Sequence, residues 1–117
     1  MLEDYLNKIV DVKIDRPLNS VHPKHSNIVY SVNYGYIPNT TSGDNEEIDA
    51  YILRVNKPLD KFKGKVVAII KRLDDVENKL IVMPEDNCEF VTEKEILKAT
   101  NFQEKYFKIE VLLSENN

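Results

Sequence analysis

The chain of 117 residues has little of what several protein classes require. A single cysteine, Cys88, excludes an internal disulfide and leaves no cluster of soft ligands for zinc. No apolar segment approaches the roughly 20 residues that a helix needs to span a bilayer, and the acidic start of the chain is unlike a secretory signal. There is no long basic run and the formal net charge is −4, which argues against nucleic acid as the main partner. We therefore expect a cytoplasmic protein without membrane or nucleic-acid partners.

What is present indicates a soluble globular domain over residues 1–117, with 42% hydrophobic and 31% charged residues. Alternating or short apolar runs predict extended segments at residues 9–14, 28–32, 34–37, 48–55, 65–73, 79–83 and 108–113. Residues 57–64 are predicted as a turn, and the segments on either side of residues 74–78 as a hairpin. Thr92 followed by Glu95 is a capping-box pattern that predicts a helix to about Tyr106. The expected fold is mainly β (α+β): a small, OB-like, mostly antiparallel β-barrel with a C-terminal helix.

The segment of residues 30–49, Y-S-V-N-Y-G-Y-I-P-N-T-T-S-G-D-N-E-E-I-D, places tyrosines just before an acidic loop. The carboxylates of this loop belong to Asp44, Glu46, Glu47 and Asp49. Carboxylates crowded on one loop repel one another unless a cation lies among them, and Mg²⁺ prefers oxygen ligands. The segment therefore indicates a metal site, although a solvated surface loop explains it as well when it is taken alone.

Carboxylates elsewhere in the chain are able to complete such a site. At one mouth of a barrel, Asp49 at the start of its strand is expected to meet Asp74 and Glu77 of the hairpin turn. Two metal ions bridged by carboxylates lower the pKa of a bound water and neutralise phosphate, and Glu46 is the candidate base for that water. Candidate phosphate donors are Arg16, Lys24, Lys71, Arg72, Lys79, Tyr30, Tyr34 and Tyr106. The alternatives are an ordinary acidic turn, packed tyrosines and, for His22 and His25, surface histidines.

Taken in order, these motifs resemble soluble, metal-dependent (family I) inorganic pyrophosphatases, of which the chain looks like a short and divergent member. The run N-Y-G-Y-I-P at residues 33–38, followed by acidic positions 44, 46 and 49, is similar to that family's signature. The resemblance implies Mg²⁺ (or Mn²⁺) as cofactor and a small phosphate compound as substrate. It implies that Asp44, Asp49, Asp74 and Glu77 bind metal and that Glu46 is the base. It further implies that Lys79, Tyr106, Tyr34, Lys24, Arg16 and Tyr30 lie at the substrate.

The chain departs from the family pattern mainly among the cations that bind phosphate. Phe107 follows the helical tyrosine where the family has lysine, and a hairpin with its arginine is missing between Lys24 and Tyr30. Arg16, Lys71 or Arg72 are candidates to replace the lost cations. The loop also reads D-N-E-E where the family has D-G-D-P.

Three functions remain open from the sequence. The first is Mg²⁺-dependent hydrolysis of inorganic pyrophosphate, the second is hydrolysis of another phosphoanhydride or nucleotide, and the third is metal or phosphate binding without catalysis. The number of subunits is also open, with Phe62, Phe90 and Phe107 as candidate contacts of a homo-oligomer.

Overall fold

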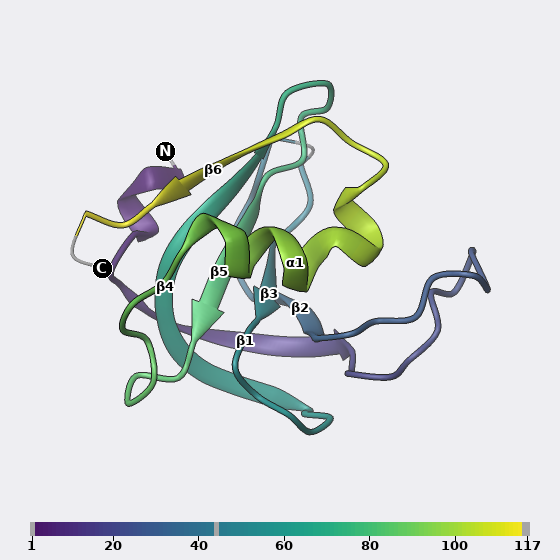
Figure 1. Cartoon of the computed structure of the whole chain (residues 1–117), viewed down its shortest axis with the longest axis horizontal. Helices are drawn as coiled ribbons and strands as arrows, with labels where there is room; N and C mark the ends of the chain where they lie inside the picture. Colours follow the sequence, from purple (N-terminus) through teal and green to yellow (C-terminus); the bar gives the residue numbers. More distant parts are fainter. Residues whose placement is uncertain (1, 44, 116–117) are drawn as a thin grey trace.

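Six β-strands, one α-helix and one 3-10 helix form the part of the chain that the computed structural model describes, residues 2–43 and 45–115 (Figure 1). In chain order they are η1 Leu2–Tyr5, β1 Ile9–Arg16, β2 Asn33–Ile37, β3 Ile48–Ile52, β4 Lys61–Arg72, β5 Lys79–Met83, α1 Glu93–Glu104 and β6 Ile109–Leu113. Among these residues no helix is long and apolar enough to cross a membrane.

Five of the strands close into a barrel. Neighbouring strands follow the order β1-β2-β3-β5-β4, and β4 pairs again with β1, so the sheet has no free edge within this ring. All these pairings are antiparallel except β3 with β5. The second half of the 12-residue β4 also carries β6. The mainly β, OB-like barrel with a C-terminal helix that the sequence predicts is confirmed.

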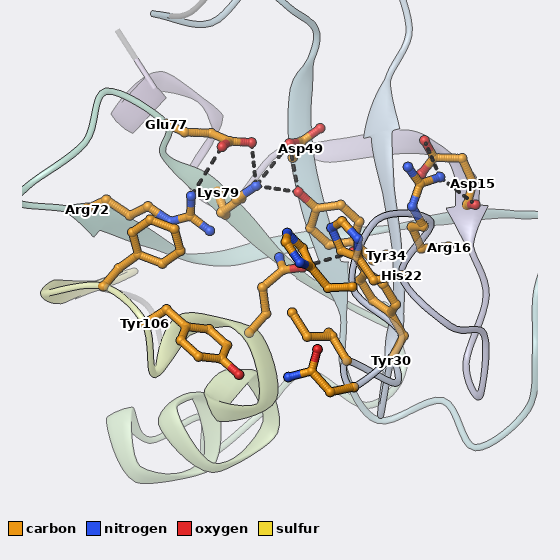
Figure 2. A pocket seen from close by; sticks show the side chains of 15 residues that line it. Asp15, Arg16, His22, Tyr30, Tyr34, Asp49, Arg72, Glu77, Lys79 and Tyr106 are labelled. Atoms are coloured by element: carbon orange, nitrogen blue, oxygen red, sulfur yellow. Dashed lines mark hydrogen bonds and ion pairs between the residues drawn. The ribbon is translucent and has the colours of Figure 1, made fainter.

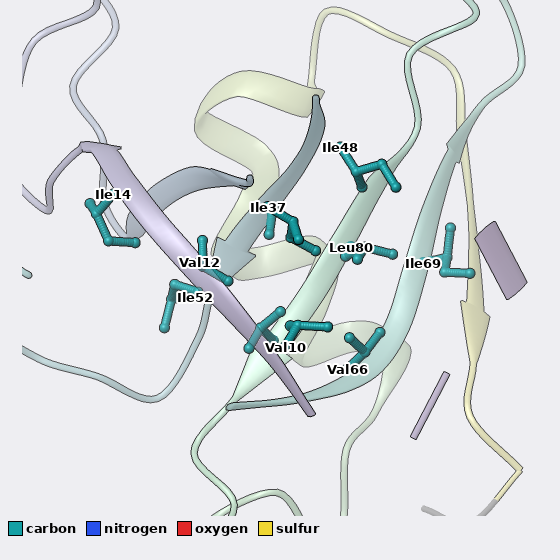
Figure 3. Packing of buried hydrophobic residues seen from close by; sticks show 11 residues of the cluster. Val10, Val12, Ile14, Ile37, Ile48, Ile52, Val66, Ile69 and Leu80 are labelled. Atoms are coloured by element: carbon teal, nitrogen blue, oxygen red, sulfur yellow. The ribbon is translucent and has the colours of Figure 1, made fainter. Parts of the chain in front are cut away.

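The barrel interior is filled by aliphatic side chains from alternate strand positions (Figure 3). In β1, for example, Val10, Val12 and Ile14 point inward and the residues between them are exposed, as the two-residue period of a strand dictates. At Gly35 in β2, a Cβ atom would lie 1.9 Å from the carbonyl oxygen of Lys13. Only glycine permits β1 to cross so close to β2 at this corner.

A second apolar cluster lies between the outer face of the barrel and α1 (Figure 1). Because successive strand residues face opposite sides, Tyr51 and Ile81 point outward here while their neighbours fill the barrel. The helix contributes Ile96, which is fully buried in this cluster. The outer face below α1 is therefore a second core, and it continues into the pocket described below.

The helix starts as predicted. The side chain of Thr92 accepts a hydrogen bond from the backbone N–H of Glu95 at 3.1 Å. The side chain of Glu95 does not complete a capping box, because its carboxylate binds Arg54 instead.

The predicted elements differ from the observed ones in three places. Residues 57–64 were predicted as a turn, but β4 begins at Lys61, where it pairs with β1. Residues 28–32 form no strand, and only Val29 makes an isolated bridge, to Val21. The third strand stops at Ile52, and Arg54 follows with a positive φ of 65°, which bends the chain.

Of the three phenylalanines named as candidate contacts of a homo-oligomer, only Phe90 is exposed, at 86%. Phe62 packs against the barrel core, and Phe107 lies half-buried beneath Arg72.

Candidate active site

The parallel pairing of β3 with β5 brings the first charged residues of the site together. It sets Asp49 opposite Lys79, at the start of both strands. In the pairing of β2 with β3, Tyr36 lies opposite Asp49, so Tyr34 is its diagonal neighbour on the same face. Strand register therefore places a carboxylate, an ammonium and a phenol side by side on the outer face of the barrel.

The ammonium of Lys79 lies between two carboxylates (Figure 2). Its Nζ is 3.0 Å from Asp49 Oδ2 and 2.6 Å from Glu77 Oε1, and it also donates to the hydroxyl of Tyr34. Only 2% of this side chain is exposed. A buried ammonium needs such partners because an unpaired charge in the interior is very costly.

Tyr34 and Glu77 both have perturbed pKa values. The hydroxyl of Tyr34 donates to Asp49 Oδ2 at 2.7 Å, and burial together with the negative charge of Asp49 raises its pKa well above the usual value. Burial also raises the pKa of Glu77, as does a hydrogen bond with Asp49, while Lys79 acts in the opposite direction. Perturbed groups that gather at a cavity are a common mark of a functional site.

Arg72, the last residue of β4, closes the site on the side of the helix. Its Nε and Nη2 donate to the two carboxylate oxygens of Glu104 at 2.9 and 2.8 Å, the two-pronged geometry that makes arginine–carboxylate pairs strong. Its Nη1 lies 3.1 Å from Glu77 Oε2 and 3.3 Å from Asp75 Oδ2. Burial alone would lower the pKa of Arg72, but the bonds and charge of Glu104 outweigh burial and raise it.

Buried hydrogen bonds connect Arg72 to the opposite wall of the pocket. Glu104 Oε2 accepts from the hydroxyl of Tyr51 at 2.6 Å, and this hydroxyl accepts from Gln103 Nε2 at 2.7 Å. Gln103 Oε1 in turn accepts from the hydroxyl of Tyr30 at 2.9 Å. The last turn of α1 thus fixes side chains on both sides of the cavity.

The cavity has a volume of about 570 Å³. It is lined by Asp15, Arg16, His22, His25, Asn27, Ile28, Tyr30, Tyr34, Asp49, Arg72, Glu77, Lys79, Gln103, Tyr106 and Phe107 (Figure 2). The histidine wall comes from the loop between β1 and β2, where the ring of His22 stacks on that of Tyr30 at a centroid distance of 6.2 Å. Partial burial, with the charges of His25 and Arg16, lowers the pKa of His22. Three cationic side chains, Arg16, Arg72 and Lys79, line the cavity, and each is paired with a carboxylate that also lines it.

The five-stranded barrel with its C-terminal helix agrees with comparisons with known proteins. A sequence model of the family described as inorganic pyrophosphatase matches residues 7–111. The chain belongs to the inorganic pyrophosphatase family. Membership makes it a hydrolase of the class that acts on the phosphoanhydride bond of inorganic pyrophosphate.

Solved pyrophosphatase structures have the same fold. The inorganic pyrophosphatase of Ehrlichia chaffeensis superposes with a TM-score of 0.72 at 17% identity, covering 93% of this chain and 88% of that one. For the enzyme of Neisseria gonorrhoeae the TM-score is 0.72 at 19% identity, with 94% and 85% covered. For that of Thermus thermophilus it is 0.66 at 18% identity, with 93% and 84% covered. No curated protein matches the chain by sequence. At such identities the likeness shows the fold and not the details of the site.

Seven of the site residues predicted from the pyrophosphatase resemblance line the cavity. They are Asp49, Glu77, Lys79, Tyr34, Tyr30, Arg16 and Tyr106. Arg16 lies at the rim, where Nη1 is 3.6 Å from a carboxylate oxygen of Asp15, and Tyr106 is 54% exposed.

Of the remaining predicted residues, the three that the structure describes do not line this cavity. The carboxylate of Asp74 turns to the backbone N–H of Lys108, at 3.3 and 3.4 Å from its two oxygens. Glu46 and Lys24 are exposed on loops outside the lining, and Asp44 lies outside the described residues. The acidic loop is nevertheless close to the hairpin turn, because a Cβ atom on Gly43 would lie 3.2 Å from the carbonyl oxygen of Val76.

The sequence interpretation missed Gln103 and Glu104, and it named Arg72 only among several candidate cations for phosphate. A signal for the first two exists. Ile96, Thr100, Gln103 and Glu104 follow the helical spacing of one face, so the two polar residues fall on the buried side of α1. A polar side chain on a buried face needs a partner, and a glutamate there points to a buried cation such as Arg72.

Proposed function

We propose that this chain hydrolyses inorganic pyrophosphate to orthophosphate in a Mg²⁺-dependent reaction, in the cytoplasm. The observation that carries the proposal is the convergence of Asp49, Glu77 and Lys79 in the cavity of a chain that belongs to the pyrophosphatase family, with ammonium-to-oxygen distances of 3.0 and 2.6 Å. In the reaction a water oxygen attacks one phosphorus atom and the bridging P–O bond breaks. The two orthophosphate products together keep the protons of the water.

The donor set of the cavity suits Mg²⁺ rather than a soft metal. Its converging groups are carboxylate oxygens, and Mg²⁺ is commonly held by one or two carboxylates, waters and substrate phosphates. Among residues 2–43 and 45–115 no group of three or more His, Cys, Asp or Glu is gathered to hold a metal ion. We therefore propose Asp49 and Glu77 as the protein ligands among these residues, with Asp44 and Asp74 as further candidates. When bound, the ion neutralises charge on the phosphate and lowers the pKa of a water molecule.

The cations and hydroxyls of the cavity are proposed to hold the phosphate groups. Lys79, held between its two carboxylates, is a point charge that stabilises developing negative charge on a phosphate oxygen. Tyr106 adds a hydroxyl donor and Arg16 adds a guanidinium at the rim. Tyr34, whose hydroxyl already donates to Asp49, is proposed to lie at the substrate beside Lys79. Tyr30, whose hydroxyl is engaged by Gln103, contributes mainly the shape of the wall. We propose Glu46 as the base that takes a proton from the attacking water. This role requires its loop to reach the cavity when substrate is bound.

The test is phosphate release from pyrophosphate at varied Mg²⁺ concentration. Asp49→Asn keeps the size of the side chain and an acceptor for Tyr34 but removes the charge, so we expect activity to fall at least about 100-fold. Asp86→Asn, the same change at an exposed residue outside the cavity lining, is expected to leave activity unchanged. Full activity in Asp49→Asn would refute the assignment of the site.

A larger phosphoanhydride, such as a nucleoside triphosphate, is the second candidate substrate. The cavity volume of about 570 Å³ lies within the range of roughly 300–1,000 Å³ that drug-sized ligands occupy. Its wall of His22, His25 and Tyr30 offers flat rings to a base. A panel of phosphate esters and anhydrides assayed with Mg²⁺ separates the two substrates, and binding without turnover across the panel would indicate a non-catalytic protein.

A further inference from the structure

Three cations were candidates to replace the phosphate-binding residues that the chain lacks, and the structure separates them. Lys71 faces away from the cavity, where its Nζ pairs with Glu3 Oε2 at 3.0 Å. Arg16 lies at the rim beside Asp15, with a third of its side chain exposed. Arg72 lines the cavity with only 4% of its side chain exposed. Neighbouring residues of a strand point to opposite faces of the sheet. Arg72 therefore enters the cavity, and Lys71 does not.

The guanidinium of Arg72 is held by Glu104 and Phe107, and its Nη1 contacts a different pair of side chains, Glu77 and Asp75. Glu104 engages Nε and Nη2 at 2.9 and 2.8 Å, and the ring of Phe107 lies 3.6 Å from the guanidinium carbon. These contacts hold the plane of the guanidinium without using Nη1. A cation that is already ordered loses little entropy when it binds a ligand.

The present partners of Nη1 are replaceable. Glu77 and Asp75 approach it at 3.1 and 3.3 Å, and their side chains are 29% and 33% exposed. Glu77 is also bound by Lys79 at 2.6 Å, so two buried cations, Arg72 and Lys79, flank one partly exposed carboxylate. A multiply charged phosphate competes well for such a pair, because arginine and lysine both bind phosphate strongly.

We infer that Nη1 of Arg72 is a substrate-binding donor: it binds an oxygen of pyrophosphate in the place that Glu77 and Asp75 occupy in the free protein. This inference rests on the proposed function, since it assigns a residue to the same cavity. Glu104 is then a positioning residue, because it touches Arg72 and not the substrate.

The test compares two double variants that make the same chemical change at different ends of α1. Arg72→Met/Glu104→Gln removes both charges of the pair at the cavity and preserves net charge. Arg54→Met/Glu95→Gln does the same for the other arginine–glutamate pair, which does not line the cavity. The probe is imidodiphosphate, whose bridging nitrogen resists hydrolysis, titrated by calorimetry at saturating Mg²⁺.

We expect the dissociation constant of imidodiphosphate to rise about tenfold or more in Arg72→Met/Glu104→Gln, as the loss of a bond between charged groups implies. It should change by no more than about twofold in Arg54→Met/Glu95→Gln, as for a distant site. Equal affinities in the two folded double variants would overturn the inference.

A measurement on the unaltered protein tests whether Arg72 binds imidodiphosphate, even where the first double variant does not fold. The chain has three arginines, so nitrogen-15 spectra of the guanidinium groups are readily assigned with Arg16→Lys and Arg54→Lys variants. On saturation with imidodiphosphate the Arg72 signals should move and the Arg54 signals should not. Unmoved Arg72 signals at saturation refute the inference. Failure of the unaltered protein to release phosphate from pyrophosphate refutes the proposed function instead, and the binding result still stands.

Discussion

Two arginine–glutamate pairs fasten α1 to the barrel, one at each end of the helix. Arg54, just beyond β3, binds Glu95 in the first turn at 2.9 and 2.8 Å, and Arg72, at the end of β4, binds Glu104 in the last turn at the same two distances. The side chains of the first pair are 17% and 33% exposed, and those of the second are 4% and 1% exposed. The same bonding geometry therefore occurs once near water and once in the interior.

The pairs differ most in what the remaining nitrogen of each arginine contacts. Nη1 of Arg54 donates to the backbone carbonyls of Asn87 and Glu89 at 3.2 and 2.8 Å, which ties down the loop before the helix. Nη1 of Arg72 contacts the carboxylates of Asp75 and Glu77, and Glu77 lines the cavity. The first arginine thus completes a structural contact, while the second keeps a donor for a ligand.

The dipole of α1 stabilises the glutamate charge of one pair and destabilises that of the other. Glu95 lies near the N-terminus of α1, where the helix dipole stabilises a negative charge, whereas Glu104 lies at the C-terminus, where the dipole opposes it. No basic residue of the last turn offsets that charge. Arg72 must therefore supply the compensation, so the buried pair depends on both partners far more than the exposed pair does.

The largest effect is expected from breaking the buried pair. Glu104→Leu leaves Arg72 buried without its main partner and removes the acceptor of Tyr51, so the free energy of unfolding should fall by about 3–5 kcal/mol. Glu95→Leu, at the exposed pair, should cost about 1 kcal/mol or less. Urea unfolding followed by circular dichroism measures both. Equal losses would mean that burial does not distinguish the two pairs.

A smaller effect is expected from the hydroxyl that supports Glu104. Tyr51→Phe removes the donor to Glu104 Oε2 and the acceptor of Gln103 Nε2 and keeps the ring in the apolar cluster. The loss should be about 1.5–3 kcal/mol, the range for hydrogen bonds to charged groups. Tyr36→Phe, outside this network, is the matched control and should change stability by about 0.5 kcal/mol or less. No difference between the two variants would show that the network does not stabilise the fold.

How much of the fold can be predicted from sequence depends on whether the signal is local or depends on long-range pairing. The barrel strands and α1 are predictable because their signals are local: alternation at residues 9–14, and Thr92 followed by Glu95 at the start of a helix. The boundary errors arise where long-range pairing decides, as at Lys61, which is a strand residue because β1 lies beside it.

The same distinction applies to the candidate site. Asp49 and Lys79 are found from a motif in the sequence, but their contact depends on the register of two strands 30 residues apart. Which of Lys71 and Arg72 enters the cavity depends on which face of β4 meets the helix, and no local pattern reports that. The sequence also placed Asp74 with the metal ligands, whereas its carboxylate binds the backbone of Lys108. Chemistry is thus easier to predict from sequence than the direction in which a side chain points.

The smallest predicted effect is the loss at low pH of the stability that the exposed pair, Arg54 and Glu95, contributes. Hydrogen bonds from Arg54 lower the pKa of Glu95 below its usual value, so the folded state holds this proton less tightly than the unfolded state. The contribution of the pair is therefore present above the usual carboxyl range and is lost as pH falls through the lowered pKa. At pH 6 we expect Arg54→Met to be less stable than the unaltered protein by up to about 1 kcal/mol, because solvent screens the pair. Urea midpoints at pH 6 and pH 3 measure the gap, which should shrink on acidification and also in high salt. A gap of the same size at both pH values would mean that Arg54 stabilises the fold through its bonds to the carbonyls of Asn87 and Glu89, without a contribution from the charge of Glu95.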